Sequence, residues 1–532
     1  MQITRWTRRA NQDDLEQKSI RSEFGWNLLS SKQTFILIII ITLLGLYIRL
    51  APVLSTDFPL NDGGFFYSLI QDLKNTGFMP PSVTSYNHAN IPFAYPPLSF
   101  YLVALLGNWS QIPTLDLIRL LPGLTSVLIV PVMYLFAAFF AEVALPSVNP
   151  RVYGLLTATV IAFWPATYSL FIEGGGIARA PGYVAAVLAC YCAFRLWSRP
   201  SVFWLISTIA ALSLTILFHP GAAWFAASSI FLSWLWFGRS WRTWRLALFL
   251  LLGTVLATSP WWWGVLTRYG IDPLIAASQT PRAWSAWESV ILWNWSTETF
   301  LPLFAFLGLL GIFWCLNHGL WFLPVWLVMM LVVNGRSVPA FAAPAMSLLI
   351  SIAVLKVIMP PLGSLGAKIA LLWGLVFVFV AAWAFPFFNY PTLRTLDRGE
   401  RAALDWIKLN TPAASRFAVI TADPLGHDPV VEWFPALTMR VSINTTQGYE
   451  WIRGAEAKRI MLYPLLQQCD SVECVEAWSK QAGQPFTHLY LSANCCVALR
   501  YSLQTQSEYV IKYSNASATI FVRSSPIHET EP

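Results

Sequence analysis

The sequence predicts a polytopic α-helical membrane protein of about eleven transmembrane helices, followed by a C-terminal extracytoplasmic α/β domain. Two observations carry this prediction. Of the 532 residues, 56% are hydrophobic and only 11% are charged, whereas soluble globular proteins carry about 25% charged residues. The apolar residues are also gathered into runs close to the ~20 residues that a membrane-spanning helix needs. This composition excludes a soluble enzyme, and it excludes a disordered chain.

The first apolar run follows a polar and basic N-terminal tail, residues 1–33, which we place in the cytoplasm. The run is too long for the core of a signal peptide and lacks a small-residue cleavage site. We therefore expect the first transmembrane helix to begin at residue 34 and the transmembrane domain to extend over 34–390. Further spans are expected at 117–142, 153–172, 181–198, 201–218, 220–237, 246–266, 299–316, 319–334, 339–358 and 369–388.

The distribution of cations indicates the orientation of these spans. Loops expected in the cytoplasm hold clustered cations, such as Arg239, Arg242 and Arg245, whereas the opposite loops hold isolated ones. This is the positive-inside pattern of proteins embedded in a lipid bilayer. The net charge of +7 is spread among the loops, so it indicates topology and not a nucleic-acid partner. An odd number of spans places the C-terminus outside.

Charged residues return after the last apolar run, and residues 391–532 are expected to form the extracytoplasmic domain. Runs of strand length occur at 416–421, 488–492, 509–513 and 519–523, with helix-like stretches at 398–409, 454–468 and 472–482. Four of the seven cysteines lie here, and in an oxidising compartment they are expected to form one or two disulfides: Cys469, Cys474, Cys495 and Cys496. The paired CxxC spacing typical of a zinc site is absent.

The long first outer loop, 55–116, holds the strongest candidates for chemistry. Asp57 and Asp62 follow the first helix, and the glycines at 63 and 64 let the backbone turn. A carboxylate at the membrane surface can act as a general base or hold a divalent cation such as Mg²⁺ or Mn²⁺. The alternative for Asp62 is a cap on the amphipathic helix expected at 65–74, which we place at the membrane interface. Tyr95 begins a second apolar stretch in this loop.

A second outer loop carries three successive glycines between Glu173 and Arg179. Exposed backbone N–H groups beside a cation can bind a phosphate group, and Glu173 is a candidate ligand for a sugar hydroxyl or, with Asp62, for a metal ion. The alternative is a flexible turn with a charge pair at the surface.

The remaining candidates lie at outer helix ends and in the C-terminal domain. His219, at a junction between two helices, is either an interfacial side chain or part of a site. Arg268 and Arg336 are candidate phosphate ligands, although an arginine at this depth can also extend to the headgroups without any function. Aromatic and acidic side chains that suit sugar binding gather in one segment, for which the alternative is a packed strand-loop-strand core: Glu432, Trp433 and Glu450.

Taken together, these features resemble the GT-C superfamily of membrane glycosyltransferases, which includes protein O-mannosyltransferases, aminoarabinose transferases and the catalytic subunit of oligosaccharyltransferase. The local similarity, in part to bacterial mannosyl- and arabinosyl-type members, rests on residues 61–67 (NDGGFFY), 95–98 (YPPL), 173–182 (EGGGIARAPG) and 219–220 (HP). The general plan of a long acidic outer loop, many helices and an outer soluble domain is also similar.

The resemblance implies transfer of a sugar from a polyprenyl-phosphate carrier to an acceptor on the extracytoplasmic face, usually with inversion. It implies that Asp62 takes the acceptor proton, with Asp57 as the fallback base. It also implies that Arg179, Arg268 or Arg336 holds the donor phosphate. Many members carry two adjacent acidic residues in the first loop, whereas Gly63 follows Asp62 here. The dependence on a metal ion and the identity of the base therefore stay open, as do the sugar and the acceptor.

Two other classes of function remain as alternatives. A transporter or lipid flippase often has internal repeats and ionisable groups near the bilayer midplane, and neither is evident in this sequence. A non-catalytic membrane scaffold with an outer binding domain would share the fold without turnover.

Overall fold

The computed structural model describes residues 29–279, 303–333, 338–363 and 393–524, together with a few positions between 366 and 380. Its first part is helical. The apolar helices are α2 (Ser31–Leu54), α5 (Thr114–Ser126), α6 (Ile129–Ala144), α7 (Pro150–Phe163), α8 (Gly176–Ser198), α9 (Val202–Phe218), α10 (Pro220–Phe237), α11 (Trp241–Tyr269), α14 (Leu303–Asn317), α15 (Phe322–Val333) and α16 (Val338–Ala353). Most of them coincide within a few residues with a run predicted from the sequence.

The number of membrane spans predicted from the sequence is not confirmed. Within the residues that the structure describes, five helical segments are long and apolar enough to cross a membrane, or six if a bent pair counts as one span: Ser31–Leu54, Thr114–Ala144, Gly176–Ser198, Trp241–Tyr269 and Pro339–Leu362, with the pair Pro150–Phe163 and Pro165–Phe171. Other apolar helices are shorter, such as the 17 residues of α9, which extend about 26 Å across a hydrocarbon core of ~30 Å. The count of eleven is therefore not confirmed, and the span expected at 369–388 lies largely outside the described residues.

The span predicted at 153–172 is broken in its middle. α7 ends at Phe163, Trp164 has an extended backbone with φ −75° and ψ 121°, and the chain turns by 84° into short helical turns. The residue before a proline disfavours the α conformation, so Pro165 explains the break. The turns η3 (Pro165–Thr167) and η4 (Ser169–Phe171) then lead to the glycine-rich loop and α8.

A fully buried arginine stabilises this break. Arg49 of α2 has no exposed surface. Its guanidinium donates to the carbonyls of Ala162 and Ile161, at 2.8 and 3.1 Å, and to the Thr167 hydroxyl at 3.4 Å. It also lies 5.1 Å from the centre of the Tyr168 ring. The carbonyls left without partners where α7 ends are thus bound by a side chain of another helix.

The first outer loop folds into α3 (Gly64–Asn75), the turn η2 (Tyr86–His88) and α4 (Leu98–Ser110). The amphipathic face predicted for 65–74 is present, but protein covers it: Leu69, Ile70 and Leu73 have no exposed surface. These side chains belong to a core shared with the C-terminal part of the chain. Placing this face in the membrane interface was therefore wrong.

Residues 393–524 contain a five-stranded sheet with strand order β2-β1-β3-β5-β4. β1 (Arg416–Ile420) pairs in parallel with β2 (Val441–Ser442) and β3 (His488–Ser492), while β5 (Ala518–Arg523) pairs antiparallel with β3 and β4 (Tyr509–Ser514). The helices of this part are α18 (Arg398–Asn410), α19 (Pro429–Thr438), α20 (Ala455–Gln467), α21 (Val472–Ala482) and α22 (Val497–Thr505). Cys469 is bonded to Cys474 and Cys495 to Cys496.

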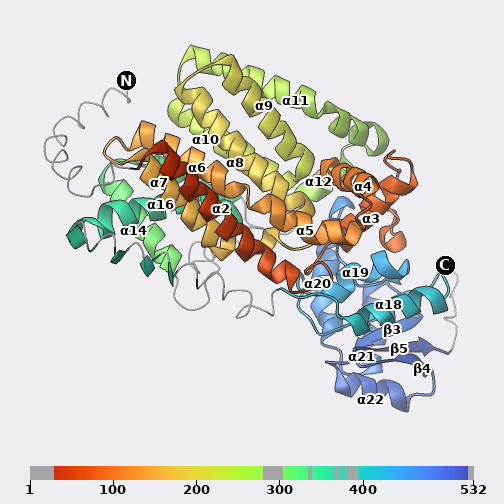
Figure 1. Ribbon diagram of the computed structural model, residues 1–532. Coiled ribbons are helices and arrows are strands. Elements are labelled where there is room, and N and C mark those ends of the chain that lie inside the picture. The colour runs from red at the N-terminus through yellow and green to blue at the C-terminus, as the bar shows by residue number, and fades with distance from the viewer. Residues whose placement is uncertain are drawn as a thin grey trace.

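The sheet-containing part lies at one end of the helical part, next to α3 and α4 of the first loop (Figure 1). Specific hydrogen bonds join the two. The Asn87 side-chain amide donates to the Ser442 carbonyl and accepts from the Ser442 N–H, at 3.0 and 2.7 Å. The Tyr86 hydroxyl donates to the Glu432 carbonyl at 2.8 Å. The first loop and the C-terminal part therefore form one continuous structure.

Candidate active site

The site is built around the start of α3. Asn61 has a left-handed backbone with φ +49°, and its side-chain oxygen accepts from the Arg394 N–H at 2.7 Å. Gly63, with φ +128°, is the N-cap of α3, and no side chain caps this helix. The alternative role of Asp62 as a helix cap is therefore not adopted, and its carboxylate points to a different helix.

Asp62 binds the first turn of α8. Its Oδ1 accepts from the Gly175 N–H at 2.7 Å, and both oxygens accept from Arg179 Nη2 at 2.9 Å. Gly175 is the N-cap of α8, so the carboxylate lies where the helix dipole favours a negative charge. The glycine-rich sequence of this loop predicts a bound phosphate, but the Asp62 carboxylate occupies the N-terminus of the helix.

Glu173 completes an acidic pair on Arg179. Its Oε2 accepts from Arg179 Nη2 at 3.1 Å, and its Oε1 accepts from the Asn61 side-chain amide at 3.0 Å. Burial, together with the negative charge of Asp62, raises the pKa of the Glu173 carboxyl, although Arg179 acts in the opposite direction. A buried carboxyl in this position favours its neutral form, and Asp62 makes the shorter contact with Arg179, at 2.9 Å against 3.1 Å.

The loop glycines allow the close approach of the two segments. A Cβ at Gly174 would lie 1.9 Å from the Asp62 carbonyl oxygen, and one at Gly175 would lie 2.5 Å from Asp62 Oδ2. Real Cβ atoms do not come this close to other heavy atoms. These two glycines are therefore required for contact between the loops. From the sequence alone, they were interpreted as part of a phosphate-binding loop.

The C-terminal part adds a carboxyl to the same place. Glu432 lies in the first turn of α19, which is a helix and not the strand of the alternative interpretation, because Asp428 caps it and Pro429 starts it. Glu432 is 9% exposed, and its Oε2 has no hydrogen-bond partner among the described residues. Burial and the charges of Asp62 and Glu450 raise its pKa well above the ordinary value.

Trp433 holds this helix against the loop. Its indole N–H donates to the Asn61 carbonyl at 3.1 Å, and it has no exposed surface. A Cβ at Gly63 would lie 2.9 Å from the Trp433 ring. The ring thus positions the start of α3, and its burial leaves no free face for the sugar contact expected from the sequence.

Tyr95 and the turn η8 (Tyr449–Trp451) form an aromatic wall. The Tyr95 ring packs against Trp451 and Phe66, at centroid distances of 5.5 and 5.2 Å, and Tyr95 lies near enough to interact electrostatically with Arg179. Glu450 lies in the same turn and adds to the negative potential at Glu432. Tyr95 and Glu450 therefore add to the electrostatic environment of the cluster around Arg179.

Asp57 lies in a separate ion-pair group. Its carboxylate accepts from Arg401 and Arg398 of α18, at 2.7 and 3.3 Å, and the hydrogen bond from Arg401 lowers its pKa. The structure therefore connects the fallback base to α18, on the surface, and not to Arg179.

The other predicted residues have different positions. Arg268 is exposed and donates to the Pro80 carbonyl at 2.9 Å. His219 Nδ1 accepts from the Ala222 N–H at 3.1 Å and caps α10, and a Cβ at Gly182 would lie 2.8 Å from the His219 Cβ. Arg336 lies outside the described residues.

The arrangement of Asp62 and Glu173 bears on a metal ion. Arg179 Nη2 lies between the two carboxylates, within 3.1 Å of each, in the position that a divalent cation would need. No group of three or more histidine, cysteine, aspartate or glutamate residues suited to a metal occurs in the part of the chain that the structure describes. In this conformation the residues do not fit a cation.

The amino-acid sequence matches no protein-family model and no curated protein. The structure, by contrast, is similar to solved membrane enzymes. The archaeal oligosaccharyltransferase AglB from Archaeoglobus fulgidus, in complex with an inhibitory peptide and a dolichol-phosphate, matches with a TM-score of 0.54 and 13% identity over 93% of this chain and 75% of its own. ArnT from Cupriavidus metallidurans, bound to undecaprenyl phosphate, matches with a TM-score of 0.55 and 14% identity over 92% of this chain and 98% of its own.

A third similar structure is the arabinofuranosyltransferase AftD from Mycobacteria, with a TM-score of 0.53 and 12% identity over 95% of this chain and 40% of its own. The chain has the GT-C fold. The resemblance inferred from short motifs is thereby confirmed at the level of the fold, and the apolar helices agree with an integral membrane protein. At these identities the GT-C fold by itself does not specify an activity.

Sequence reasoning missed one important residue. Asn61 connects Glu173, Arg394 and Trp433 through its side chain and carbonyl, but it is not among the candidate site residues predicted from the sequence. A signal was available, since asparagine is enriched in left-handed turns and Asn61 precedes two glycines.

Proposed function

We propose that this protein is a membrane glycosyltransferase that moves a sugar from a polyprenyl-phosphate carrier to an acceptor on the extracytoplasmic face, with inversion at the anomeric carbon. The observation that carries the proposal is the incomplete bonding of the cluster around Arg179. Its Nε and the Glu432 Oε2 are buried and have no hydrogen-bond partner among the described residues. Buried polar groups without partners are rare in folded proteins, and a bound substrate would satisfy both.

The proposed reaction gives Asp62 and Arg179 different roles. The acceptor hydroxyl oxygen bonds to the anomeric carbon while the bond from that carbon to the phosphate oxygen breaks, and the electron pair leaves on the phosphate. Asp62 takes the acceptor proton, since its carboxylate is held at the start of α8 beside the arginine that faces the phosphate. Arg179 stabilises the departing phosphate, and one such preorganised donor typically contributes about 2.7–4 kcal/mol to lowering a barrier.

The protonation of the carboxyl groups near Asp62 supports these roles of Asp62 and Arg179. Burial favours the neutral forms of Glu173 and Glu432, which reduces the negative charge close to Arg179. Additional negative charge there would repel a phosphate. In the proposal, the neutral Glu432 carboxyl, together with Glu450, binds the sugar.

The lipid carrier accounts for the position of the site. A polyprenyl tail fits the apolar helices, and its phosphate lies at headgroup depth near the start of α8. The positive-inside pattern of the sequence favours an extracytoplasmic position for this end of α8 and for residues 391–532, with the 1–33 tail in the cytoplasm. In agreement, AglB and ArnT were solved with polyprenyl phosphates bound.

Transfer of label from radiolabelled polyprenyl-phosphate sugars to membrane extract tests the proposal. The purified protein is compared with Asp62→Asn and with Asp57→Asn, a change of the same kind in the same loop. Transfer by the wild type and by Asp57→Asn, together with its loss in Asp62→Asn, supports the enzyme. Absence of transfer from a panel of mannosyl, arabinosyl and glucosyl carriers favours a non-catalytic scaffold, and equal transfer by Asp62→Asn removes the proposed base.

A further inference from the structure

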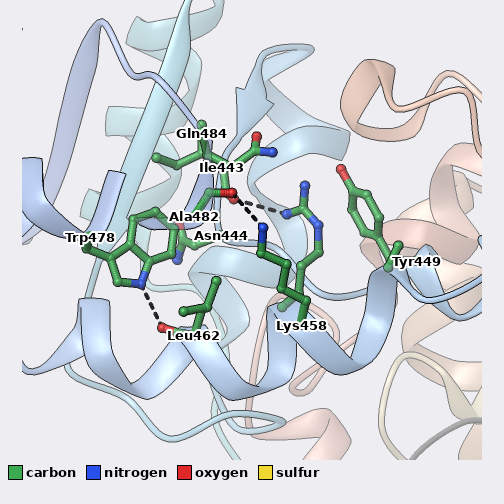
Figure 2. A pocket seen from close by; sticks show the side chains of 10 residues that line it. Ile443, Asn444, Tyr449, Lys458, Leu462, Trp478, Ala482 and Gln484 are labelled. Carbon is green, nitrogen blue, oxygen red and sulfur yellow. Dashed lines mark hydrogen bonds between the residues drawn. The ribbon is translucent and has the colours of Figure 1, made fainter. Parts of the chain in front are cut away.

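A cavity of about 250 Å³ lies in the C-terminal part, away from Asp62. Its wall includes Lys458 and Arg459 of α20, Tyr449 of η8, and Trp478 and Ala482 of α21. Figure 2 shows Lys458 between Trp478 on one side and Tyr449 on the other. The cavity shares no residue with the cluster around Arg179. Its volume is below the ~300–1,000 Å³ typical of pockets for drug-sized ligands, so it fits a small molecule.

Two cations line this cavity, and a third, Arg416, binds the lining residue Gln484. The hydrogen-bond acceptors of all three are neutral oxygens. Lys458 Nζ donates to the Ala482 carbonyl at 3.3 Å, and Arg459 Nη1 donates to the Ile443 and Thr445 carbonyls at 3.0 and 2.9 Å. Arg416 donates to the Gln484 side-chain oxygen at 2.8 Å. None of these cations pairs with a carboxylate in the part of the chain that the structure describes.

Arg459 is a half-buried cation whose hydrogen-bond acceptors are both neutral carbonyls. Its guanidinium carbon lies 3.6 Å from the centre of the Tyr449 ring, and burial lowers its pKa, with the positive charge of Arg416 acting in the same direction. A cation at such a position is costly unless an anion or several strong acceptors complete its environment.

The polar groups of the cavity wall that a ligand could still bind are hydrogen-bond donors. Asn444 uses both ends of its amide on Val419, accepting at 3.0 Å and donating at 2.9 Å. The Tyr449 hydroxyl accepts from Asn87 at 3.0 Å. The Gln484 oxygen is used by Arg416, which leaves the NH₂ group of this lining residue as a further donor. A ligand for such a wall must supply acceptor oxygens.

We propose that this cavity binds a small anionic molecule that presents a phosphate or carboxylate group to Lys458 and Arg459. Charge-assisted hydrogen bonds from these two side chains hold the anion, and the apolar wall at Leu462 and Trp478 covers the rest of the molecule. This inference does not depend on the proposed transferase activity, since none of its residues lies in the cluster around Arg179.

Calorimetric titration of the purified full chain in detergent tests the inference, with inorganic phosphate, glucose 1-phosphate, glucuronate and glucose as probes. We expect at least one anion to bind more tightly than glucose. Lys458→Gln should weaken that binding by about tenfold or more, the effect of losing one charged hydrogen-bond partner. The matched change Lys480→Gln removes an exposed cation of α21 outside the cavity and should leave the affinity within about twofold.

Two further variants separate this cavity from other sites. Ala455→Phe places a larger side chain in the cavity and should abolish binding, whereas Arg179→Gln alters the membrane-side cluster and should not affect it. A preference for glucose 1-phosphate or inorganic phosphate over glucuronate identifies a phosphate ligand, and the reverse order identifies a carboxylate; either result supports the proposal. It is overturned if glucose binds as tightly as the anions, if no anion binds at about 10 mM, or if Lys458→Gln and Lys480→Gln behave alike.

Discussion

Arg179 donates from a single nitrogen, Nη2, to both carboxylate oxygens of Asp62 at 2.9 Å, across 117 residues of sequence. The same nitrogen reaches Glu173 at 3.1 Å, so three ionisable side chains meet at one atom. The Nε of this arginine stays buried without a partner among the described residues. The guanidinium therefore orders the acidic residues on one edge and keeps another edge for a ligand, which is the arrangement that the proposed reaction needs.

The two aspartates of the first loop should behave differently on substitution. Asp62→Asn keeps the shape of the side chain but removes the charge that would accept a proton, so we expect kcat of sugar transfer to fall roughly 10²–10⁴-fold. Asp57→Asn removes only exposed ion pairs to Arg398 and Arg401, which typically contribute less than about 1 kcal/mol. Steady-state kinetics and thermal melting of both variants measure this contrast. Equal losses of kcat would contradict the assignment of the base.

Because the two outer loops are in close contact, adding a single methyl group at Gly174 should affect both stability and activity. Because a Cβ at Gly174 would lie 1.9 Å from the Asp62 carbonyl oxygen, Gly174→Ala must displace one loop and separate Asp62 from Arg179. We expect a stability loss of about 1–3 kcal/mol, the usual effect of overpacking, together with a loss of transfer.

A matched change in an open position controls for the methyl group itself. Nothing lies within 4 Å of a Cβ at Gly264 in α11, so Gly264→Ala should keep activity and stabilise the helix by up to about 1 kcal/mol. Melting temperatures in detergent and initial rates are the measurements. Wild-type behaviour of Gly174→Ala would show that the loops are not in contact in the working protein.

The sequence predicts the helical part well because long apolar runs have few other ways to fold. The prediction of helices from apolar runs is wrong where a proline interrupts a run. Pro165 breaks the span predicted at 153–172 in this way. In the C-terminal part, the strands β1, β3, β4 and β5 coincide with predicted runs, while the two-residue β2 is too short to have a pattern.

The site was predicted as a set of residues but not as a set of contacts. Asp62, Glu173 and Arg179 were chosen because charged side chains stood beside glycines at helix ends, and the structure brings them together. The sequence has no signal for long-range pairing, so it could not reveal that Asp62 occupies the start of α8 or that Asp57 pairs with α18. For the same reason, the burial of Trp433 against Asn61 was not anticipated.

Glu432 should make the stability of the protein depend on pH. Its pKa is raised in the folded state by burial and by nearby carboxylates, so the folded form holds a proton that the unfolded form releases above its ordinary pKa near 4.3. Stability is therefore greatest below that pH and falls as the pH rises toward the folded-state pKa. Glu432→Gln imitates the neutral acid and should melt higher than the wild type at pH 8, with a smaller difference at pH 5.

Melting curves across this pH range measure the effect. Glu473→Gln, a change of an exposed glutamate on α21, serves as the control and should shift the melting temperature equally at both pH values. A difference between Glu432→Gln and the wild type that is constant with pH would mean that Glu432 is ionised in the folded protein.

Arg49 should act on the site from a distance by holding the break after α7. Its guanidinium donates from two nitrogens to Ala162, Ile161 and Thr167, which a lysine ammonium, with one nitrogen, does not reproduce. Arg49→Lys should therefore lose about 1.5–3 kcal/mol of stability and should reduce transfer by misplacing Glu173, which follows the break. Arg151→Lys, at an exposed position near the other end of α7, should change stability by no more than about 0.5 kcal/mol. Melting temperatures and rates in detergent measure both variants, and Arg49→Lys with unchanged rates would separate the buried arginine from the function of the loop.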